Sequence, residues 1–207
     1  MIAKPVILLG GGGHAKVCID VLNKQSRKII GFVSPDENSE TVLGVAHLGD
    51  DDLVLNYSPD DVELVNAIGF LPKSSVRQVC YERFKQKAYT FVTLVHSSAI
   101  IAEEVILKEG AQVMAGTVIQ PGVIVGENSI INTRVSVDHD CNLGSNCHIA
   151  PGSVLCGNVV LGEGVFVGSG AVIIQNIHVP ADSIIAAGET VRKNVSALSD
   201  KQKVGIQ

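Results

Sequence analysis

The chain has 207 residues and a formal net charge of -5, with 46% hydrophobic and 18% charged residues. This balance excludes a disordered protein, and the sequence lacks the clustered basic stretch typical of nucleic-acid binding. No apolar run reaches the ~18 residues needed to cross a bilayer, and the apolar start of the chain runs into glycines rather than a signal-peptide cleavage site. We therefore expect a cytoplasmic globular protein with reduced cysteines.

The first part of the chain alternates strand-like and helix-like segments, which predicts a small, mostly parallel α/β domain over residues 1–94. Four aliphatic runs predict strands, at 6–9, 29–33, 62–68 and 89–95. Apolar residues at helical spacing predict a helix over 14–23, through Ala15, Val17, Cys18, Val21 and Leu22. A second helix is expected over 74–87, capped by Ser74 or Ser75.

Four consecutive glycines connect the first strand to the first helix. Residues 10–15 match the pattern G-x-G-x-x-A of dinucleotide-binding loops. A glycine loop before a helix offers free N–H groups and the positive helix end to a phosphate. An NAD site would need a larger sheet and an acid closing the second strand, which here ends Val-Ser-Pro-Asp. The loop therefore predicts an anion site without establishing the nucleotide.

The second part is a hexapeptide repeat, expected to form a domain over 95–195 before a tail at 196–207. Every sixth residue from 95 to 191, seventeen in all, is Val, Ile or Leu. An α-helix has no such period, and an ordinary strand alternates every two residues. A period of six is typical of short strands joined at corners, with each aliphatic residue stacked on its counterpart one coil away. The repeat resembles that of left-handed parallel β-helices, whose 18-residue triangular coils each contain three hexads, and it would make five to six coils.

The glycine loop and the repeat together resemble the NeuD/PglD-type sugar acetyltransferases. The N-terminal segment VILLGGGGHAKV and the segment at 130–148, IINTRVSVDHDCNLGSNCH, carry this resemblance. It implies a Rossmann-like α/β domain followed by a left-handed β-helix. It also implies acetyl-CoA as co-substrate without a metal, a nucleotide-linked amino sugar as acceptor, N-acetylation of a 4-amino-4,6-dideoxy sugar, and a homotrimer.

The resemblance identifies His139 as the general base and Asp140 as its acidic partner. A histidine can accept a proton near neutral pH, and a neighbouring carboxylate can orient it. Adjacent side chains on a straight strand point in opposite directions, so the pair can meet only where the chain bends. Asp138 also flanks the histidine, and the residues alone do not choose between the two acids. A solvated corner histidine without a catalytic role is the alternative.

Other site residues follow from position and from the resemblance. One coil beyond His139, Gly157 could leave room for a thioester and supply an oxyanion N–H; a glycine needed only for a tight corner is compatible with the same position. The resemblance assigns CoA contacts to His148, Ser169 and Ala187, the first of which would face the base of a neighbouring subunit. Asn132 matches a polar residue near the family's base.

The resemblance places the sugar nucleotide against the glycine loop. The implied contacts are Gly12, Gly13, His14, Ser34, Asp36 and Leu71. The family often has an acidic pair after its second strand, where this chain has Ser34 and Pro35 with Asp36 one residue later. The C-terminal sequence SALSDKQKVGIQ also differs from the family's Gly-x-Pro-Ala-Lys-like tail, which leaves the contacts to the far end of CoA open.

Three alternative functions remain open at this point. A zinc hydratase on the same fold would need three protein ligands, and the histidines at 96, 139, 148 and 178 lack the close pair that such an enzyme shows. A non-catalytic nucleotide-binding protein would leave His139 incidental. An O-acetyltransferase acting on a free sugar acid, such as sialic acid, could use the same base.

Overall fold

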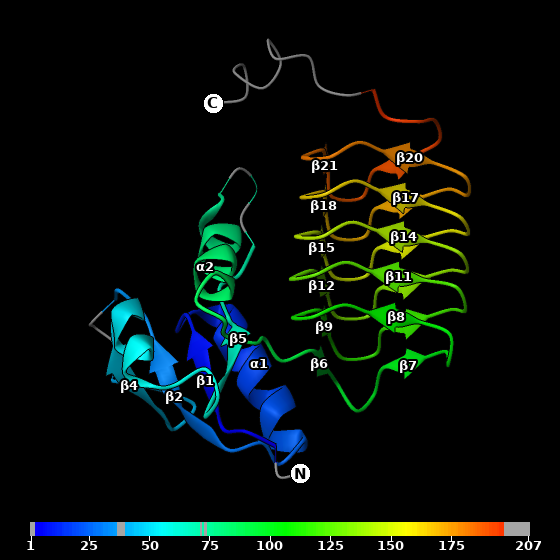
Figure 1. The fold of residues 1–207 in the computed structure, drawn as a ribbon. Helices are drawn as coiled ribbons and strands as arrows, with labels where there is room; N and C mark the ends of the chain where they lie inside the picture. Colours follow the sequence, from blue (N-terminus) through cyan, green and yellow to red (C-terminus); the bar gives the residue numbers. More distant parts are fainter. Residues whose placement is uncertain (1–2, 37–39, 71, 73, 197–207) are drawn as a thin grey trace. The chain divides into compact units, whose positions relative to one another are not determined.

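A computed structural model describes residues 3–36, 40–70, 72 and 74–196 of the chain. It divides into two compact units, Met1–Ser97 and Ser98–Gln207. The predicted contact residue Leu71 and the tail from residue 197 onward lie outside the described residues. Figure 1 shows a small α/β unit and a regular stack of short strands, and each is considered by itself.

The first unit is built on a sheet with the strand order β3-β4-β2-β1-β5. β1 pairs in parallel with β2 and β5, and β2 pairs in parallel with β4. Because these strands run in parallel, their carboxyl ends share one edge of the sheet. The elements are β1 (Val6–Leu9), α1 (Gly13–Lys24), β2 (Ile29–Val33), β3 (Thr41–Val42), β4 (Val45–Gly49), the 3-10 helix η1 (Asp51–Asn56), β5 (Glu63–Asn66), α2 (Val76–Lys85) and β6 (Leu94–Val95).

The expected helix over 14–23 corresponds to α1, with one change in its buried face. Ala15, Cys18, Val21 and Leu22 are buried as the spacing predicts, but Val17 is 40% exposed and Ile19 is buried in its place. α2 covers Val76–Lys85 and is therefore shorter than expected. Ser75 is the N-cap residue, but its side chain makes no capping hydrogen bond. The Ser74 hydroxyl accepts the Val76 N–H at 3.5 Å.

The strand expected over 89–95 is too long. Ala88 has a φ of 65°, and the Tyr89 N–H donates to the Phe84 carbonyl at 3.1 Å. Tyr89 therefore closes α2 instead of opening a strand, because a left-handed residue with such a bond is a helix C-terminal motif. Beyond it, one isolated bridge joins Phe91 to Leu64, and the strand β6 is confined to Leu94–Val95.

The sequence patterns also gave no sign of the β3–β4 hairpin. Its two-residue turn consists of Leu43 and Gly44, with φ values of 49° and 79°. Two positive φ values are what a tight hairpin turn requires, but a leucine at the first of these positions is an unusual sequence signal.

The second unit is a parallel β-helix, as the repeat predicts. Pairing is shifted by 18 residues throughout, for example Val118 with Ser136. Face 1 carries β7 (Ile100–Ile101), β10 (Val118–Ile119), β13 (Ser136–Val137), β16 (Val154–Leu155), β19 (Val172–Ile173) and β22 (Thr190–Val191). Face 2 carries β8 (Ile106–Leu107), β11 (Ile124–Val125), β14 (Asn142–Leu143), β17 (Val160–Leu161) and β20 (His178–Val179). Face 3 carries β9 (Gln112–Val113), β12 (Ile130–Ile131), β15 (His148–Ile149), β18 (Phe166–Val167) and β21 (Ile184–Ile185).

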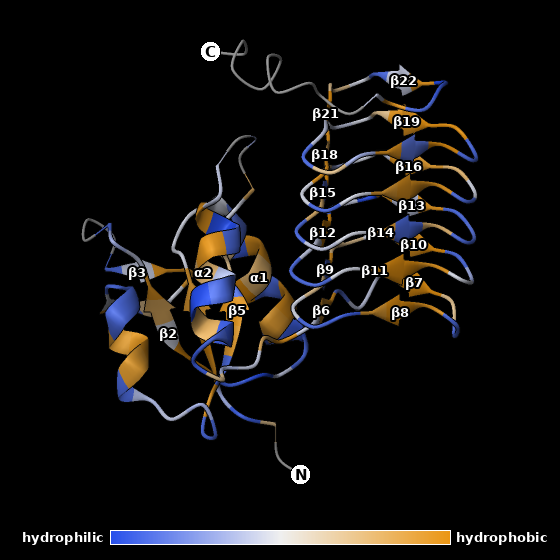
Figure 2. Ribbon diagram, turned by 45° about the horizontal axis from the view of Figure 1, so that its top comes forward, coloured by the Kyte–Doolittle hydropathy of each residue, from blue (hydrophilic) through white to orange (hydrophobic). Residues whose placement is uncertain are grey.

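The second residue of each short strand forms the aliphatic stack. These residues are the predicted hexad series, and they are buried from Val113 to Val191, whereas Val95, Ile101 and Leu107 at its start are partly exposed. Figure 2 shows the hydrophobic strands alternating with polar corners. The fold thus combines a small α/β unit with a β-helix of hexapeptide repeats, as predicted.

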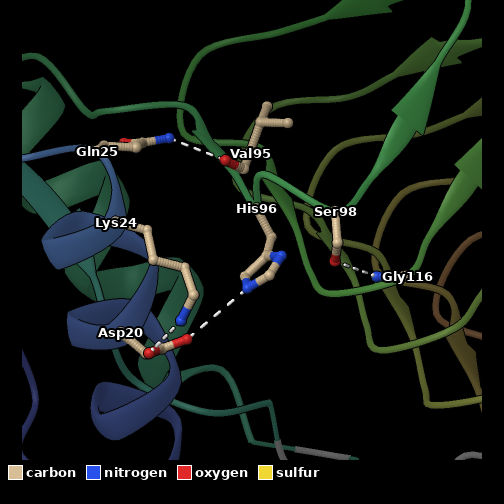
Figure 3. Close-up of polar contacts among 7 residues, drawn as sticks. All are labelled: Asp20, Lys24, Gln25, Val95, His96, Ser98 and Gly116. Atoms are coloured by element: carbon tan, nitrogen blue, oxygen red, sulfur yellow. Dashed lines mark hydrogen bonds and ion pairs between the residues drawn. The ribbon is translucent and has the colours of Figure 1, made fainter.

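Polar contacts join α1 to Val95 and His96 near the end of the first unit (Figure 3). The Gln25 side chain donates to the Val95 carbonyl at 2.9 Å. His96 Nε2 lies 3.7 Å from Asp20 Oδ2, and Lys24 also pairs with this carboxylate. At the start of the second unit, the Gly116 N–H donates to the Ser98 hydroxyl at 3.1 Å. Within the described residues, no helix combines the length and apolar character needed to span a membrane.

Candidate active site

The predicted base lies at the corner between β13 on face 1 and β14 on face 2. Asp140 has a φ of 60° there, a left-handed conformation that is uncommon outside glycine but enriched in Asp and Asn. The corner is tied to both neighbouring coils, since the Asp140 N–H donates to the Pro121 carbonyl at 3.1 Å and the His139 carbonyl accepts the Asn158 N–H at 2.8 Å. This is the bend that adjacent residues need in order to face each other.

His139 and Asp140 form a hydrogen-bonded pair. Nδ1 of the imidazole lies 2.8 Å from Asp140 Oδ2, whereas Asp138 Oδ1 accepts the His139 backbone N–H at 2.8 Å. The structure therefore decides between the two flanking acids: Asp140 contacts the ring. A proton held on Nδ1 by the carboxylate leaves Nε2 as the acceptor of the neutral imidazole.

The electrostatic surroundings favour a protonated His139. The hydrogen bond to Asp140 raises the pKa of His139 above its ordinary value, and the charges of Asp138 and Asp140 act in the same direction, against the effect of burial. Both side chains of the pair are largely exposed, at 60% and 67%. The ring is thus accessible to a substrate and becomes a stronger proton acceptor through its neighbours.

Gly157 lies directly against the imidazole, one coil beyond it. A Cβ atom at this position would be 2.6 Å from His139 Nε2 and 2.7 Å from Cε1. The φ of Gly157 is outside the left-handed region, unlike that of Gly152 at 71°. A tight-corner conformation therefore does not require glycine here, but a side chain at this position would displace the imidazole.

The backbone N–H of Gly157 has no role in the fold. Gly157 is buried, its carbonyl accepts the Asn176 N–H at 3.0 Å, and across the described part of the chain no acceptor takes its own N–H. Prolines 121 and 151, which have no N–H, occupy the equivalent position at other corners. The unbonded N–H of Gly157 therefore remains a candidate donor to a substrate oxygen.

The four residues with predicted CoA or substrate roles on the β-helix lie away from His139 in one chain. Asn132 Nδ2 is 3.4 Å from His148 Nε2, while its Oδ1 accepts the Thr133 N–H at 2.8 Å. The His148 ring, on face 3, is 7% exposed and its centroid lies 5.4 Å from that of Phe166. Ser169 and Ala187 follow on successive coils at the corner between faces 3 and 1, where the Ser169 carbonyl accepts the Gly188 N–H at 2.9 Å. His139 belongs to the corner between faces 1 and 2.

A pocket of about 430 Å³ lies in the first unit, at the carboxyl edge of its sheet. Gly12, Gly13, His14 and Ser34 line it, as predicted for a nucleotide site, whereas Asp36 is not among its lining residues. The Asp36 N–H instead donates to the Ser34 hydroxyl at 3.2 Å.

The glycines of the loop have different physical roles. Gly10 has a φ of 100°, and Gly11 packs so closely that a Cβ would be 2.5 Å from Phe32 Cε2. Gly12 and Gly13 have open space where a side chain would lie. Since α1 begins at Gly13, directly after this loop, the positive end of the helix dipole lies at the loop and favours an anion there.

Two features of this pocket were not predicted from the sequence. Asp51 lines it from the start of η1, a position that could be found only after β4 had been recognised. Arg77, 4% exposed, donates from Nη1 to the Asn66 and Ile68 carbonyls, both at 2.7 Å. This buried guanidinium stabilises the backbone after β5, and that backbone segment also lines the pocket.

Across the described ranges, no three His, Cys, Asp or Glu side chains cluster closely enough to hold a metal ion.

Comparison with known proteins agrees with this arrangement. Residues 5–84 match the family model of the PglD N-terminal domain, and residues 140–175 match the bacterial transferase hexapeptide model of six repeats. A structure of perosamine N-acetyltransferase from Caulobacter crescentus is 35% identical, with a TM-score of 0.86 over 94% of this chain and 91% of that one. This chain belongs to the NeuD/PglD-type sugar acetyltransferases.

Other members show the same likeness. The acetyltransferase domain of PglB from Neisseria gonorrhoeae is 28% identical, with a TM-score of 0.85 over 93% of each chain. UDP-N-acetylbacillosamine N-acetyltransferase of Bacillus subtilis is 33% identical over 115 residues, which are 54% of this chain and 52% of that protein. The alignment thus spans about half the length of this curated relative. The Caulobacter structures hold CoA and GDP-perosamine, two of them in variants with one histidine replaced.

Proposed function

We propose that the protein transfers the acetyl group of acetyl-CoA to the amine of a nucleotide-linked amino sugar. The observation that carries this proposal is the His139–Asp140 pair, whose Nε2 would lie 2.6 Å from a Cβ at position 157, so that a side chain there would displace the ring. In support, relatives similar over nine-tenths of the chain bind CoA and GDP-perosamine or acetyl-CoA.

In the proposed reaction the acceptor amine attacks the thioester carbonyl carbon. Nε2 of His139 takes the proton that the nitrogen loses, and Asp140 stabilises the resulting imidazolium. The carbonyl oxygen becomes an oxyanion that the unused Gly157 N–H can bind. When the tetrahedral intermediate collapses, the C–S bond breaks, and the imidazolium returns its proton to the CoA thiolate. The products are the amide and free CoA.

The first unit is proposed to hold the nucleotide. Its pocket lies at the positive end of α1, which favours a diphosphate, and His14 and Ser34 line it. An acyltransferase acting on a small free acceptor would not need this unit.

We further propose that the active enzyme is a homotrimer. His148, Ser169 and Ala187 occupy a different face and corner of the β-helix from His139, so one chain does not complete the site. Closed cyclic symmetry would bring the CoA positions of one subunit to the base of its neighbour. Light scattering should return three times the monomer mass at micromolar concentration; a monomer mass would contradict this.

Asp140→Asn should shift the pH dependence of transfer. The carboxylate raises the pKa of His139, so its loss lowers that pKa, and the base becomes deprotonated at lower pH. The acidic limb of the kcat/KM profile should therefore move toward lower pH, and the plateau should fall, because a weaker base remains. An unchanged profile would show that Asp140 has no role in positioning or tuning the base.

The acceptor is tested with a matched pair of substrates. The free 4-amino sugar should be a far poorer acceptor than its nucleotide-linked form, with the loss shared between kcat and KM, because remote binding energy also orients the reacting amine. Steady-state kinetics on both acceptors measures this. Equal kcat/KM values would reject the docking at the glycine loop and favour acetylation of a free sugar.

A further inference from the structure

The pocket in the first unit runs along successive strands of the sheet. Its lining residues follow β5 (Ile68), β1 (Gly12 and Gly13), β2 (Ser34) and β4 (Asp51). Neighbouring strands lie ~4.8 Å apart, so the end of β4 is about 10 Å from the end of β1. A nucleotide with its diphosphate at the glycine loop would therefore place its ribose near Ser34 and its base near Asp51.

Asp51 differs from the two acids that flank it. Asp50 caps η1, since its Oδ1 accepts the Asp52 N–H at 3.0 Å, and Asp52 forms an ion pair with Arg83. Neither lines the pocket. Among the described lining residues, Asp51 is the one carboxylate. It is partly buried, and burial raises its pKa, with the Arg83 charge acting in the opposite direction.

The rest of the pocket offers apolar surface. Pro35 lines it next to Ser34, and Phe70 and Val76 line it from the segments that follow β5 and begin α2. Phe32 and His47 stack beneath the loop at 4.9 Å between centroids, and the Ser34 carbonyl lies 3.0 Å from His47 Nε2. The wall of the pocket at Ser34 is thus supported by packed rings and a hydrogen bond.

The Asp51 carboxylate can accept hydrogen bonds from donor groups of a base, and it repels oxygen atoms that are themselves acceptors. Guanine presents two parallel donors, N1–H and the 2-amino group, which match the two oxygens of a carboxylate. Uracil presents one N–H between two carbonyl oxygens, and those oxygens would face the carboxylate. Selection would therefore combine attraction of guanine with repulsion of uracil.

We propose that Asp51 is a specificity-determining residue that selects a guanine nucleotide by accepting N1–H and the 2-amino group. This inference rests on the proposed function, because it assumes a nucleotide-linked acceptor. It adds a base-reading position that lies one strand beyond the expected acidic site at the end of β2.

The test is calorimetric titration of the full chain with GDP, IDP and UDP. IDP retains N1–H but lacks the 2-amino group. The wild-type protein should bind GDP roughly 10–100-fold more tightly than UDP, with IDP between them. Asp51→Asn should bring the three affinities close together, since an amide lacks the charge and one acceptor. Asp52→Asn, a change on the same helix outside the pocket, should keep the wild-type order.

Equal binding of GDP and UDP by the wild-type protein would overturn the inference, and so would an Asp51→Asn variant that keeps the wild-type ratio. If that variant does not fold, the wild-type series of three nucleotides decides alone. Transfer assays separate the two proposals. Equal kcat/KM for GDP- and UDP-linked acceptors rejects base selection but leaves the proposed function intact, whereas acetylation of the free sugar alone rejects both.

Discussion

Replacement of His139 by Ala should lower kcat/KM for acetyl transfer by roughly 10²–10⁴-fold, the usual contribution of a general base. Its Nε2 is the proposed proton acceptor, and no second histidine lies on the same corner segment, 138–141. The side chain is 60% exposed and lies outside the aliphatic stack, so the folded state should be retained. Purified variant and wild-type protein are compared in a continuous assay of CoA release.

A matched control is available on the same β-helix. His178 is exposed on β20 of face 2, and His178→Ala should leave the transfer rate unchanged. Acetyl-CoA binding by the His139 variant should also persist, because the proposed CoA positions lie elsewhere. Turnover like that of the wild type in purified His139→Ala would end the assignment of the base.

Gly157→Ala should cost at least ~10²-fold in kcat, comparable to the loss of an oxyanion donor. The new methyl group would be 2.6 Å from Nε2 and 2.7 Å from Cε1 of His139, far inside van der Waals contact, so the ring must move away from its productive position. The methyl would also occupy the space that the thioester carbonyl needs. The change introduces no left-handed backbone strain, so the melting temperature should change little while turnover is lost.

Gly44→Ala should have the opposite effect to Gly157→Ala, with lower stability and unchanged turnover. Gly44 has a φ of 79°, and a Cβ there would meet no atom of the described residues within 4 Å, so an alanine is strained but unobstructed. It should cost about 1–2 kcal/mol of stability and leave kcat unchanged. Thermal unfolding and kinetics on both glycine variants separate the two effects. Full activity in Gly157→Ala would refute the close packing of base and substrate.

Local sequence patterns were most informative where one interaction dominates. The hexad pattern depends only on the burial of one aliphatic residue in every six. Each strand from β9 to β22 ends on the predicted residue of this series. In the first unit, long-range packing changed the details. The segment 89–92 has strand-like residues, but the Tyr89 hydroxyl donates to the Tyr57 carbonyl at 2.6 Å and its N–H closes α2. Such non-local bonds leave no trace in local periodicity.

The same division holds for the site. The sequence by itself predicted the stacked hexads, because regular spacing translates directly into position along a repeating structure, and it also predicted the glycine loop before α1. The 18-residue coil and the candidate base His139 came from the resemblance to the family, and Gly157 came from counting one coil beyond that base. Only the tertiary structure decided that Asp140 rather than Asp138 contacts the imidazole, that the ring lies 2.6 Å from where a Cβ at position 157 would be, and that Asp51 rather than Asp36 lines the pocket. These outcomes depend on the left-handed bend at Asp140 and on the order of strands in the sheet. Both are set by how distant segments pack.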